Sequence, residues 1–347
     1  MPSPKVLIAL SGGVDSSVAA YLMQQSGYDC IGVTMRLHDP SDTAPDARAI
    51  AENLNIPFVL ADCTAEFEEM VIRHFIRSYE AGLTPNPCVE CNRHLKFGLL
   101  LQQADALGCE KIVTGHYCRI RQDSNGRYLL WKAADPAKDQ SYFLYTLTQQ
   151  QLSRTLFPLA ELTKEQARSI AEEQGFLNAR KRDSQDICFI PDGDYFRFIR
   201  DYTRKTYPQG QFLSADGQCV GMHQGAIAYT RGQRKGLGLA MGKPVYVLHK
   251  DMTRNTVTVG DDAQLFSTTL LANDWNFIPF DRLSQPLRVM AKARSRMAEQ
   301  PATVYPEANG TARVVFDTPQ RAITTGQAVV LYDGELVIGG GTITEVL

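Results

Sequence analysis

The sequence predicts an α/β protein: a doubly wound parallel sheet, followed by a small mixed linker domain and a C-terminal β-barrel. In the first 200 or so residues, short apolar runs alternate with amphipathic helices, which is the pattern of βαβ units. From about Tyr207 onward, turn residues recur at short spacing and apolar residues tend to alternate, which is typical of β-strands. We therefore expect three domains, at residues 1–205, 206–269 and 270–347.

Composition and charge narrow the class of protein. The chain has 347 residues, of which 44% are hydrophobic and 21% charged, as in ordinary globular proteins. Its formal net charge of −2 provides no global field for nucleic acid, so any such binding needs local basic patches. No apolar run reaches the roughly 18 residues of a membrane span, and the first predicted strand leaves no room for a signal peptide. Eight cysteines without such a signal indicate a reducing compartment, so we expect a cytoplasmic protein without a membrane partner.

The stretch 5–23 is the most informative part of the chain. A short apolar run predicts a buried strand, and apolar residues at helical spacing predict a helix directly after the turn. Gly12 and Gly13 allow a tight turn and close approach of a ligand, and the helix N-terminus behind them presents bare N–H groups. Hydroxyl groups in register add further donors: Ser11, Ser16 and Ser17. The stretch therefore predicts an anion site, although it lacks the lysine of a Walker loop.

Other elements follow the same alternation of strand and helix. We expect strands at 30–35, 57–60 and 111–114, helices at 46–53, 67–79 and 164–174, and a hairpin spanning 117–133. Because Pro85 and Pro87 disfavour a helix, the C-x-x-C of Cys88 and Cys91 is expected on a loop before the next helix.

Six short blocks occur in order from the first strand to the last few residues: Ser-Gly-Gly-Val-Asp-Ser at 11–16, Thr-Pro-Asn-Pro-Cys-Val-Glu-Cys-Asn at 84–92, Thr-Gly-His-Tyr at 114–117, Lys-Asp-Gln-Ser-Tyr at 138–142, Asp-Ser-Gln-Asp-Ile-Cys-Phe-Ile at 183–190 and Gly-Gly-Gly at 339–341. Together they closely resemble the tRNA-specific 2-thiouridylases, the MnmA family of PP-loop ATP pyrophosphatases. The resemblance implies ATP-dependent replacement of the C2 oxygen of a wobble uridine by sulfur. It also implies ATP with Mg²⁺, tRNA as substrate, and a persulfide-donating sulfur carrier or cysteine desulfurase as partner.

The resemblance also implies roles for particular residues. Cys188 would carry the persulfide, and Cys91 would either resolve it, leaving a disulfide, or help to release a sulfide. Residues implied in ATP binding are Ala9, Leu10, Ser11, Gly12, Gly13, Val14, Asp15, Ser16, Met35 and Gly115. Residues implied in contact with the target base are Asn86, Pro87 and Cys88. Residues implied in tRNA binding are His116, Lys138, Asp139, Gln140, Arg294, Ser295 and Gln327.

The thiols leave one choice open. Many relatives have Asp where this chain has Cys88, so three cysteines (Cys88, Cys91 and Cys188) are present where two suffice for sulfur transfer. Three thiolates would also suit a [4Fe–4S] cluster or Zn²⁺ with one open position. Cations at 180–182, and a helix beginning near Asn92, are expected to favour the thiolates. The remaining cysteines are interpreted as packing residues: Cys30, Cys63, Cys109, Cys118 and Cys219.

Two other functions stay open from the residues. The chain could be a different PP-loop ATP pyrophosphatase, acting on another acceptor without paired cysteines. It could also be a non-enzymatic RNA-binding protein that retains the ATP loop. Lys292, Arg294 and Arg296 alternate, so on a strand they would share one face and suit RNA phosphates; a charged, solvated edge strand is the alternative.

Overall fold

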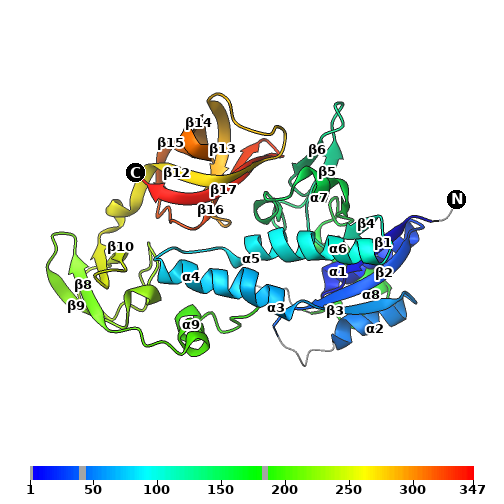
Figure 1. Cartoon of the computed structure of the whole chain (residues 1–347), viewed down its shortest axis with the longest axis horizontal. Coiled ribbons are helices and arrows are strands. Elements are labelled where there is room, and N and C mark those ends of the chain that lie inside the picture. Colours follow the sequence, from blue (N-terminus) through cyan, green and yellow to red (C-terminus); the bar gives the residue numbers. More distant parts are fainter. Residues whose placement is uncertain (1–2, 39–43, 182–186) are drawn as a thin grey trace.

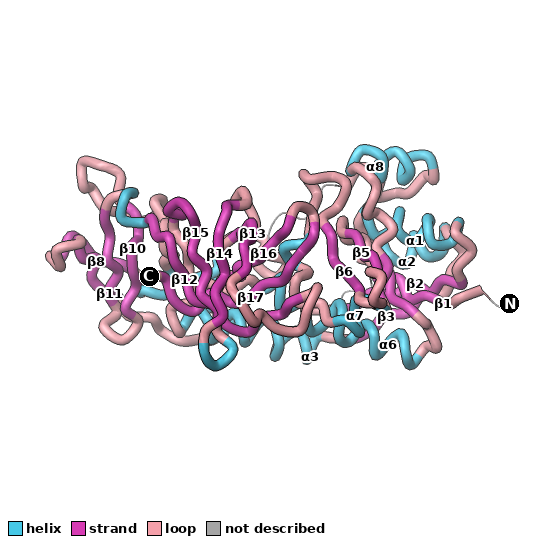
Figure 2. The backbone as a smooth tube through the Cα atoms, turned by 90° about the horizontal axis from the view of Figure 1, so that it is seen from above, coloured by secondary structure: helices cyan, strands magenta, loops and turns pink. Residues whose placement is uncertain are grey.

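The computed structural model describes residues 3–38, 44–181 and 187–347. The molecule is elongated, with a parallel sheet at one end, a small mixed sheet at the other and a barrel between them (Figures 1 and 2). Asp183 to Asp186, part of one of the motifs, lie outside the described residues.

The predicted parallel sheet is present, with five strands in the order β3-β2-β1-β4-β7. Its strands are β1 (Lys5–Ala9), β2 (Asp29–Arg36), β3 (Phe58–Asp62), β4 (Lys111–Val113) and β7 (Thr155–Leu156). β1 pairs with β2 on one side and β4 on the other, so the strand order reverses at β1. Ligands of open α/β sheets bind outside the carboxyl ends of the strands at such a point, which is where the loop at 10–13 lies.

Helices cover both faces of this sheet. The side chains of β1 point alternately toward one face and the other, and those on both faces are buried. Val6 and Ile8 pack with three helices, α1 (Val14–Gln25), α2 (Pro45–Asn53) and α8 (Lys164–Glu173). Leu7 packs on the opposite face, with the helices that connect β3 to β4. The helix predicted at 164–174 is α8, which opens with a capping box at Thr163.

Two long helical segments cross the middle of the molecule (Figure 1). The first consists of α3 (Thr64–Phe67), η1 (Glu68–Arg73) and α4 (His74–Glu80), and the second of α5 (Pro87–Glu90), η2 (Cys91–Leu99) and α6 (Leu100–Ala106); η1 and η2 are π-helical. The prediction that the C-x-x-C lies on a loop is wrong, because the second segment begins at Pro87. A proline suits the first helical position, and Asn86 caps the helix.

The predicted hairpin and the mixed middle sheet are also present. Strands β5 (Arg119–Gln122) and β6 (Tyr128–Trp131) pair antiparallel. After η3 (Ser141–Phe143), α7 (Gln149–Ser153) and α9 (Tyr195–Thr203), four strands form a sheet in the order β10-β11-β8-β9. They are β8 (Gly210–Ser214), β9 (Cys219–His223), β10 (Tyr246–Asp251) and β11 (Thr256–Gly260). The pairing of β11 with β8 is parallel and the others are antiparallel, so the sheet is mixed.

Six strands close the predicted C-terminal barrel, because β12 pairs with both β15 and β17. They are β12 (Phe266–Phe277), β13 (Leu287–Lys292), β14 (Gln300–Pro306), β15 (Ala312–Arg321), β16 (Ala328–Asp333) and β17 (Leu336–Val346); short 3₁₀ turns at η4 (Ala226–Ala228), η5 (Asp262–Leu265) and η6 (Ala308–Gly310) complete the chain. The sequence did not reveal that β6 pairs with β17, which joins the hairpin to the barrel.

One basic stretch lies differently from the prediction. Strand β13 ends at Lys292, so Arg294 and Arg296 belong to the following turn and not to one strand face. Within the described ranges, no helix is long and apolar enough to cross a membrane.

Candidate functional site

The loop between β1 and α1 has the geometry of an anion site. Ser16 Oγ lies 3.2 Å from Ser11 Oγ and donates to the Gly13 carbonyl at 3.0 Å. Gly13 is the N-cap of α1, and no side chain in the described part of the chain caps this helix. The first-turn N–H groups therefore have no intrahelical partner and point toward the loop. Ser11 is exposed beside them, so the loop offers backbone and hydroxyl donors to a phosphate group.

Asp15, in the first turn of α1, takes part in a polar cluster that the sequence did not reveal. Lys164 Nζ donates to both its carboxylate oxygens, at 2.7 and 2.9 Å, and Tyr117 Oη donates to Oδ1 at 2.8 Å. The Lys164 side chain is buried and Asp15 is about one-third exposed. A buried lysine thus fixes the orientation of Asp15. Lys164 belongs to no short motif, which is why only the folded chain reveals it.

Close packing surrounds the same loop. An added Cβ at Gly115 would lie 2.8 Å from the backbone carbon of Asp15 and from the nitrogen of Ser16. Gly12 has φ +69°, and a Cβ there would meet Asp46 at 2.8 Å. Asn178, also missed from sequence, donates to the Gly12 carbonyl at 3.1 Å from a buried position. These contacts hold the loop in one conformation.

The other residues implied in ATP binding lie on the same strands and helix. Ala9 is half-buried at the end of β1, and Leu10 is buried directly after it. Val14 is buried at the start of α1, and Met35 is half-buried near the end of β2.

Cys88 and Cys91 lie on one helical segment. Asn86 Oδ1 accepts from the Cys88 N–H at 3.2 Å, so Asn86 is the N-cap of this helix, two residues before Cys88. Cys88 is exposed, whereas Cys91, one turn further on, is buried. Of the residues implied in contact with the target base, Pro87 is buried and Asn86 is half-buried.

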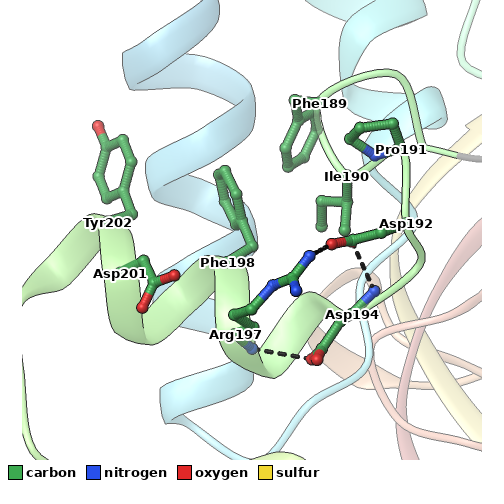
Figure 3. Close-up of a pocket in the computed structure, with 9 residues that line it drawn as sticks. All are labelled: Phe189, Ile190, Pro191, Asp192, Asp194, Arg197, Phe198, Asp201 and Tyr202. Carbon is green, nitrogen blue, oxygen red and sulfur yellow. Dashed lines mark hydrogen bonds and ion pairs between the residues drawn. The ribbon is translucent and has the colours of Figure 1, made fainter.

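Cys188 is exposed, but the residues after it are anchored. Phe189 packs edge-on against Phe67 and Phe75, with ring centroids 5.7 and 5.5 Å apart. This segment and α9 line a cavity of about 320 Å³, in which Arg197 pairs with Asp192 (Figure 3). The aromatic packing therefore fixes where Cys188 emerges at the surface.

The three thiols interact electrostatically with one another and with Lys96. Desolvation by the surrounding protein, together with the neighbouring thiols of Cys91 and Cys88, raises the pKa of Cys188 to about 11, and Lys96 opposes this rise. Burial also raises the pKa of Cys88 and of Cys91, and Lys96 again lowers both. Lys96 is thus the cation that favours the thiolates, and it was missed from sequence.

The π-helix explains how Lys96 reaches this cluster. In η2 the Leu100 N–H bonds to the Leu95 carbonyl, five residues back. Such widened turns bring residues five apart, such as Cys91 and Lys96, closer to one face of the helix than an α-helix does. An α-helix would turn Lys96 well away from Cys91.

The cations at 180 and 181, which the sequence suggested would favour the thiolates, pair with carboxylates elsewhere. Arg180 is highly exposed and lies 3.6 Å from Glu172, and Lys181 pairs with Asp46 at 2.8 Å. Arg182 lies outside the described residues. The expected helix start near Asn92 is also wrong, because the helix begins at Pro87, before both cysteines.

The described residues contain no group of three or more His, Cys, Asp or Glu side chains that could hold a metal ion. As they lie, Cys88, Cys91 and Cys188 therefore do not fit a metal cluster.

Residues implied in tRNA binding near the parallel sheet are engaged within the fold. His116 Nδ1 lies 2.8 Å from Thr114 Oγ1, and burial lowers its pKa well below the usual value, with Lys96 adding to the effect. Gln140 Oε1 accepts from the Tyr117 N–H at 2.9 Å. The Asp139 carboxylate accepts from its neighbour Ser141, and Lys138 is half-buried. These contacts order the loop beside His116.

The barrel residues implied in tRNA binding differ in their surroundings. Arg294 is turned inward and donates to the Ala322 carbonyl and to Thr324 Oγ1. Burial lowers the pKa of its guanidinium, and nearby arginines add to this. Ser295 is half-buried in the adjoining turn. The Gln327 side chain donates to the Thr84 carbonyl at 2.8 Å, and so contacts the segment that precedes the cysteines.

The fold and the loop define a class of ATP-binding enzyme, and comparison with known families agrees. Residues 4–192 match a family model described as the tRNA methyl transferase HUP domain. Residues 197–261 match the PRC-barrel domain of the same series, and 267–343 an aminomethyltransferase β-barrel domain. The chain belongs to the tRNA-specific 2-thiouridylase (MnmA) family, a class of ATP-dependent sulfurtransferases.

The relatives match over nearly their whole length. The chain is 46% identical over 356 residues to the tRNA-specific 2-thiouridylase MnmA of Clostridioides difficile, covering 99% of each chain. It is 49% identical over 355 residues to that of Moorella thermoacetica, covering 98% of this chain and 99% of the relative. Among solved structures, a 4-thiouridine synthetase–RNA complex with bound ATP aligns at 16% identity and a TM-score of 0.36, over 57% of this chain and 50% of that one. That score is too low to carry any argument.

Proposed function

We propose that this chain uses ATP to replace the C2 oxygen of the wobble uridine of tRNA by sulfur. One arrangement supports this best: Cys91 and Cys188 lie close enough together that the Cys91 thiol raises the pKa of Cys188. Lys96 connects these thiols with the region of the nucleotide loop, because it influences both the thiols and His116. His116 follows Gly115, which packs on the backbone of the loop. Activation by ATP and attack by sulfur can therefore take place at neighbouring positions.

The first half-reaction is adenylation of the uridine. The C2 oxygen attacks the α-phosphorus of ATP, and pyrophosphate leaves. The N–H groups at the start of α1 and the serine hydroxyls hold the phosphates and stabilise the charge that develops on them. Asp15, oriented by Lys164, would hold Mg²⁺ together with the phosphates, since its Oδ2 accepts one hydrogen bond and keeps a lone pair. When bound, Mg²⁺ would neutralise the departing pyrophosphate.

The second half-reaction transfers sulfur from a persulfide on Cys188. The terminal sulfur attacks C2, and AMP leaves. Cys91 thiolate then attacks the sulfur of Cys188, which breaks the S–S bond and leaves the transferred sulfur on the uridine. Formation of the Cys91–Cys188 disulfide supplies the two electrons that bring the transferred sulfur to the sulfide level, and an external thiol reductant then returns both cysteines to thiols. In the alternative path, the Cys91 thiolate attacks the Cys188 sulfur first, which forms the same disulfide and releases a sulfide; that sulfide attacks C2, and AMP leaves.

Exposure suits these assignments. Cys188 is exposed, as a residue must be that receives sulfur from a persulfide-donating carrier or cysteine desulfurase. Cys91 is buried, as suits a thiol that acts only on Cys188. Lys96 offsets part of the rise in thiol pKa that burial causes.

A second route would use a [4Fe–4S] cluster on Cys88, Cys91 and Cys188, but the arrangement of the three thiols does not favour it. The variant Cys88→Asp decides between the two routes. If thiols alone act, the anaerobically purified variant thiolates tRNA without bound iron. If activity and iron are lost together, the thiol route is wrong.

The overall reaction is tested by incubating the purified chain with unmodified tRNA, ATP, and a cysteine desulfurase with cysteine. Nucleoside mass spectrometry should find 2-thiouridine at the wobble position, with AMP and pyrophosphate formed in equal amounts. ADP and orthophosphate as the main tRNA-dependent products would contradict the proposal. Matched reactions of Cys91→Ser and Cys188→Ser should form no 2-thiouridine; thiolation by Cys91→Ser would show that Cys91 is not required for sulfur transfer.

A further inference from the structure

The segment before the cysteine helix is attached to the barrel. The Thr84 N–H donates to the Thr325 carbonyl at 2.9 Å. Gln327 Nε2 donates to the Thr84 carbonyl at 2.8 Å and lies 3.4 Å from that of Pro85. Backbone groups of the catalytic domain are thus paired with the loop between β15 and β16, more than 240 residues later in the chain.

This contact is closely packed. Gly326 has φ +86°, and a Cβ there would lie 2.9 Å from the Cβ of Leu83 and the nitrogen of Thr84. Only glycine brings the two backbones so close together. Thr84 Oγ1 is buried there and has no hydrogen-bond partner among the described residues, so the contact depends on the backbone pairs and on Gln327.

The connection from this contact to the cysteines is short and stiff. Pro85 and Pro87 are buried and have fixed φ angles, so the chain between them has little freedom. Asn86 caps the helix by accepting from the Cys88 N–H. A shift of the carbonyls of Thr84 and Pro85 therefore reaches Cys88 within three residues.

A second tie holds the helix beyond its cysteines. Arg93 Nη1 pairs with Asp274 of β12 at 2.5 Å. Asp274 has φ +50° at an irregularity in the pairing of β12 with β17, which directs it away from the regular strand. The barrel thus holds the cysteine helix on both sides of Cys88 and Cys91.

We propose that Gln327 is a positioning residue for sulfur transfer, whose side-chain amide fixes the start of the cysteine helix relative to the nucleotide loop. This inference rests on the proposed function. It differs from the direct tRNA contact that the family resemblance implies, because both N–H donors of the amide face protein carbonyls. The barrel then determines where the sulfur-transfer thiols lie.

The variant Gln327→Met keeps the length of the side chain and removes its donors. Gln320→Met is the matched control: Gln320 is a buried glutamine of the same barrel whose amide nitrogen, among the described residues, donates to the carbonyl and the hydroxyl of Thr318 on its own strand. For the full-length chain preloaded with persulfide by a cysteine desulfurase and cysteine, we measure single-turnover thiolation, pyrophosphate release and the Kd for tRNA.

We expect Gln327→Met to slow thiolation at least tenfold, because displacements near 1 Å cost on the order of a hundredfold in rate. Pyrophosphate release and the Kd for tRNA should stay within twofold of the original chain, because adenylation precedes sulfur attack, and Gln320→Met should leave all three unchanged. A Kd that weakens as much as thiolation slows would overturn the proposal, and so would an equal loss of thiolation in Gln320→Met.

Alkylation of Cys91 gives a readout that does not depend on thiolation. Cys91 is buried, so iodoacetamide should label it slowly in the original chain and in Gln320→Met. In Gln327→Met the helix is expected to shift, so iodoacetamide should label Cys91 at least fivefold faster, as measured by peptide mass spectrometry. Unchanged labelling would overturn the positioning role, whereas absence of 2-thiouridine from the original chain would refute only the proposed function.

Discussion

Gly115→Ala is expected to disable adenylation through the backbone alone. The added Cβ would lie 2.8 Å from the carbon of Asp15 and the nitrogen of Ser16, and ordinary contacts begin at 3.4 Å. β4 and the first turn of α1 must therefore move apart by 0.6 Å. Backbone atoms cannot rotate away as a side chain can, so the displacement shifts the N–H groups that hold the phosphates. A misplacement near 1 Å costs about a hundredfold in rate, so a loss of roughly tenfold is expected.

The assay is tRNA-dependent exchange of labelled pyrophosphate into ATP, with thermal unfolding measured on the same samples. Gly98→Ala is the control, because a Cβ there meets only the Arg93 carbonyl, at 3.4 Å, in a helix that favours alanine. We expect normal exchange for this control. Exchange within twofold of the original chain for Gly115→Ala would refute the reasoning.

Three further substitutions test the surroundings of the site. Lys96→Met should lower thiolation several-fold at pH 7.5 and shift its pH profile to higher pH, because the thiols lose the cation that lowers their pKa. Lys96→Arg should behave normally, and an unshifted profile for Lys96→Met would contradict this reasoning. Arg294→Met should cost about 1–3 kcal/mol in urea unfolding, because the Ala322 carbonyl and Thr324 Oγ1 lose the hydrogen bonds that the guanidinium donates. The exposed neighbour variant Arg296→Met should stay within about 0.5 kcal/mol, and equal losses would show that the inward contacts of Arg294 add nothing. Lys164→Met should abolish AMP formation with an unchanged Kd for tRNA, since Asp15 loses the ammonium group that orients it; normal AMP formation would rule this out.

The sequence by itself determined the class of fold and the nucleotide loop, because both depend on local patterns. Apolar runs that alternate with amphipathic helices require a sheet covered on both faces. Glycine pairs and hydroxyl residues next to a helix start predict an anion site from local sequence alone. The strand texture after Tyr207 likewise predicted the mixed sheet and the barrel, which the structure confirms.

Tertiary structure alone decided which residues surround the reactive groups. Lys164 reaches Asp15 across 149 residues, and Gln327 reaches Thr84 across 243, so no spacing in the sequence relates them. Lys96 joins the thiols because η2 is π-helical, a departure from α-helical periodicity that the apolar pattern does not signal. Cys88 and Cys91 lie on a helix instead of a loop because the cap at Asn86 and a proline at the first helical position outweigh the usual effect of proline. Side-chain chemistry is local, whereas the electrostatic surroundings that control it are assembled only when distant segments pack together.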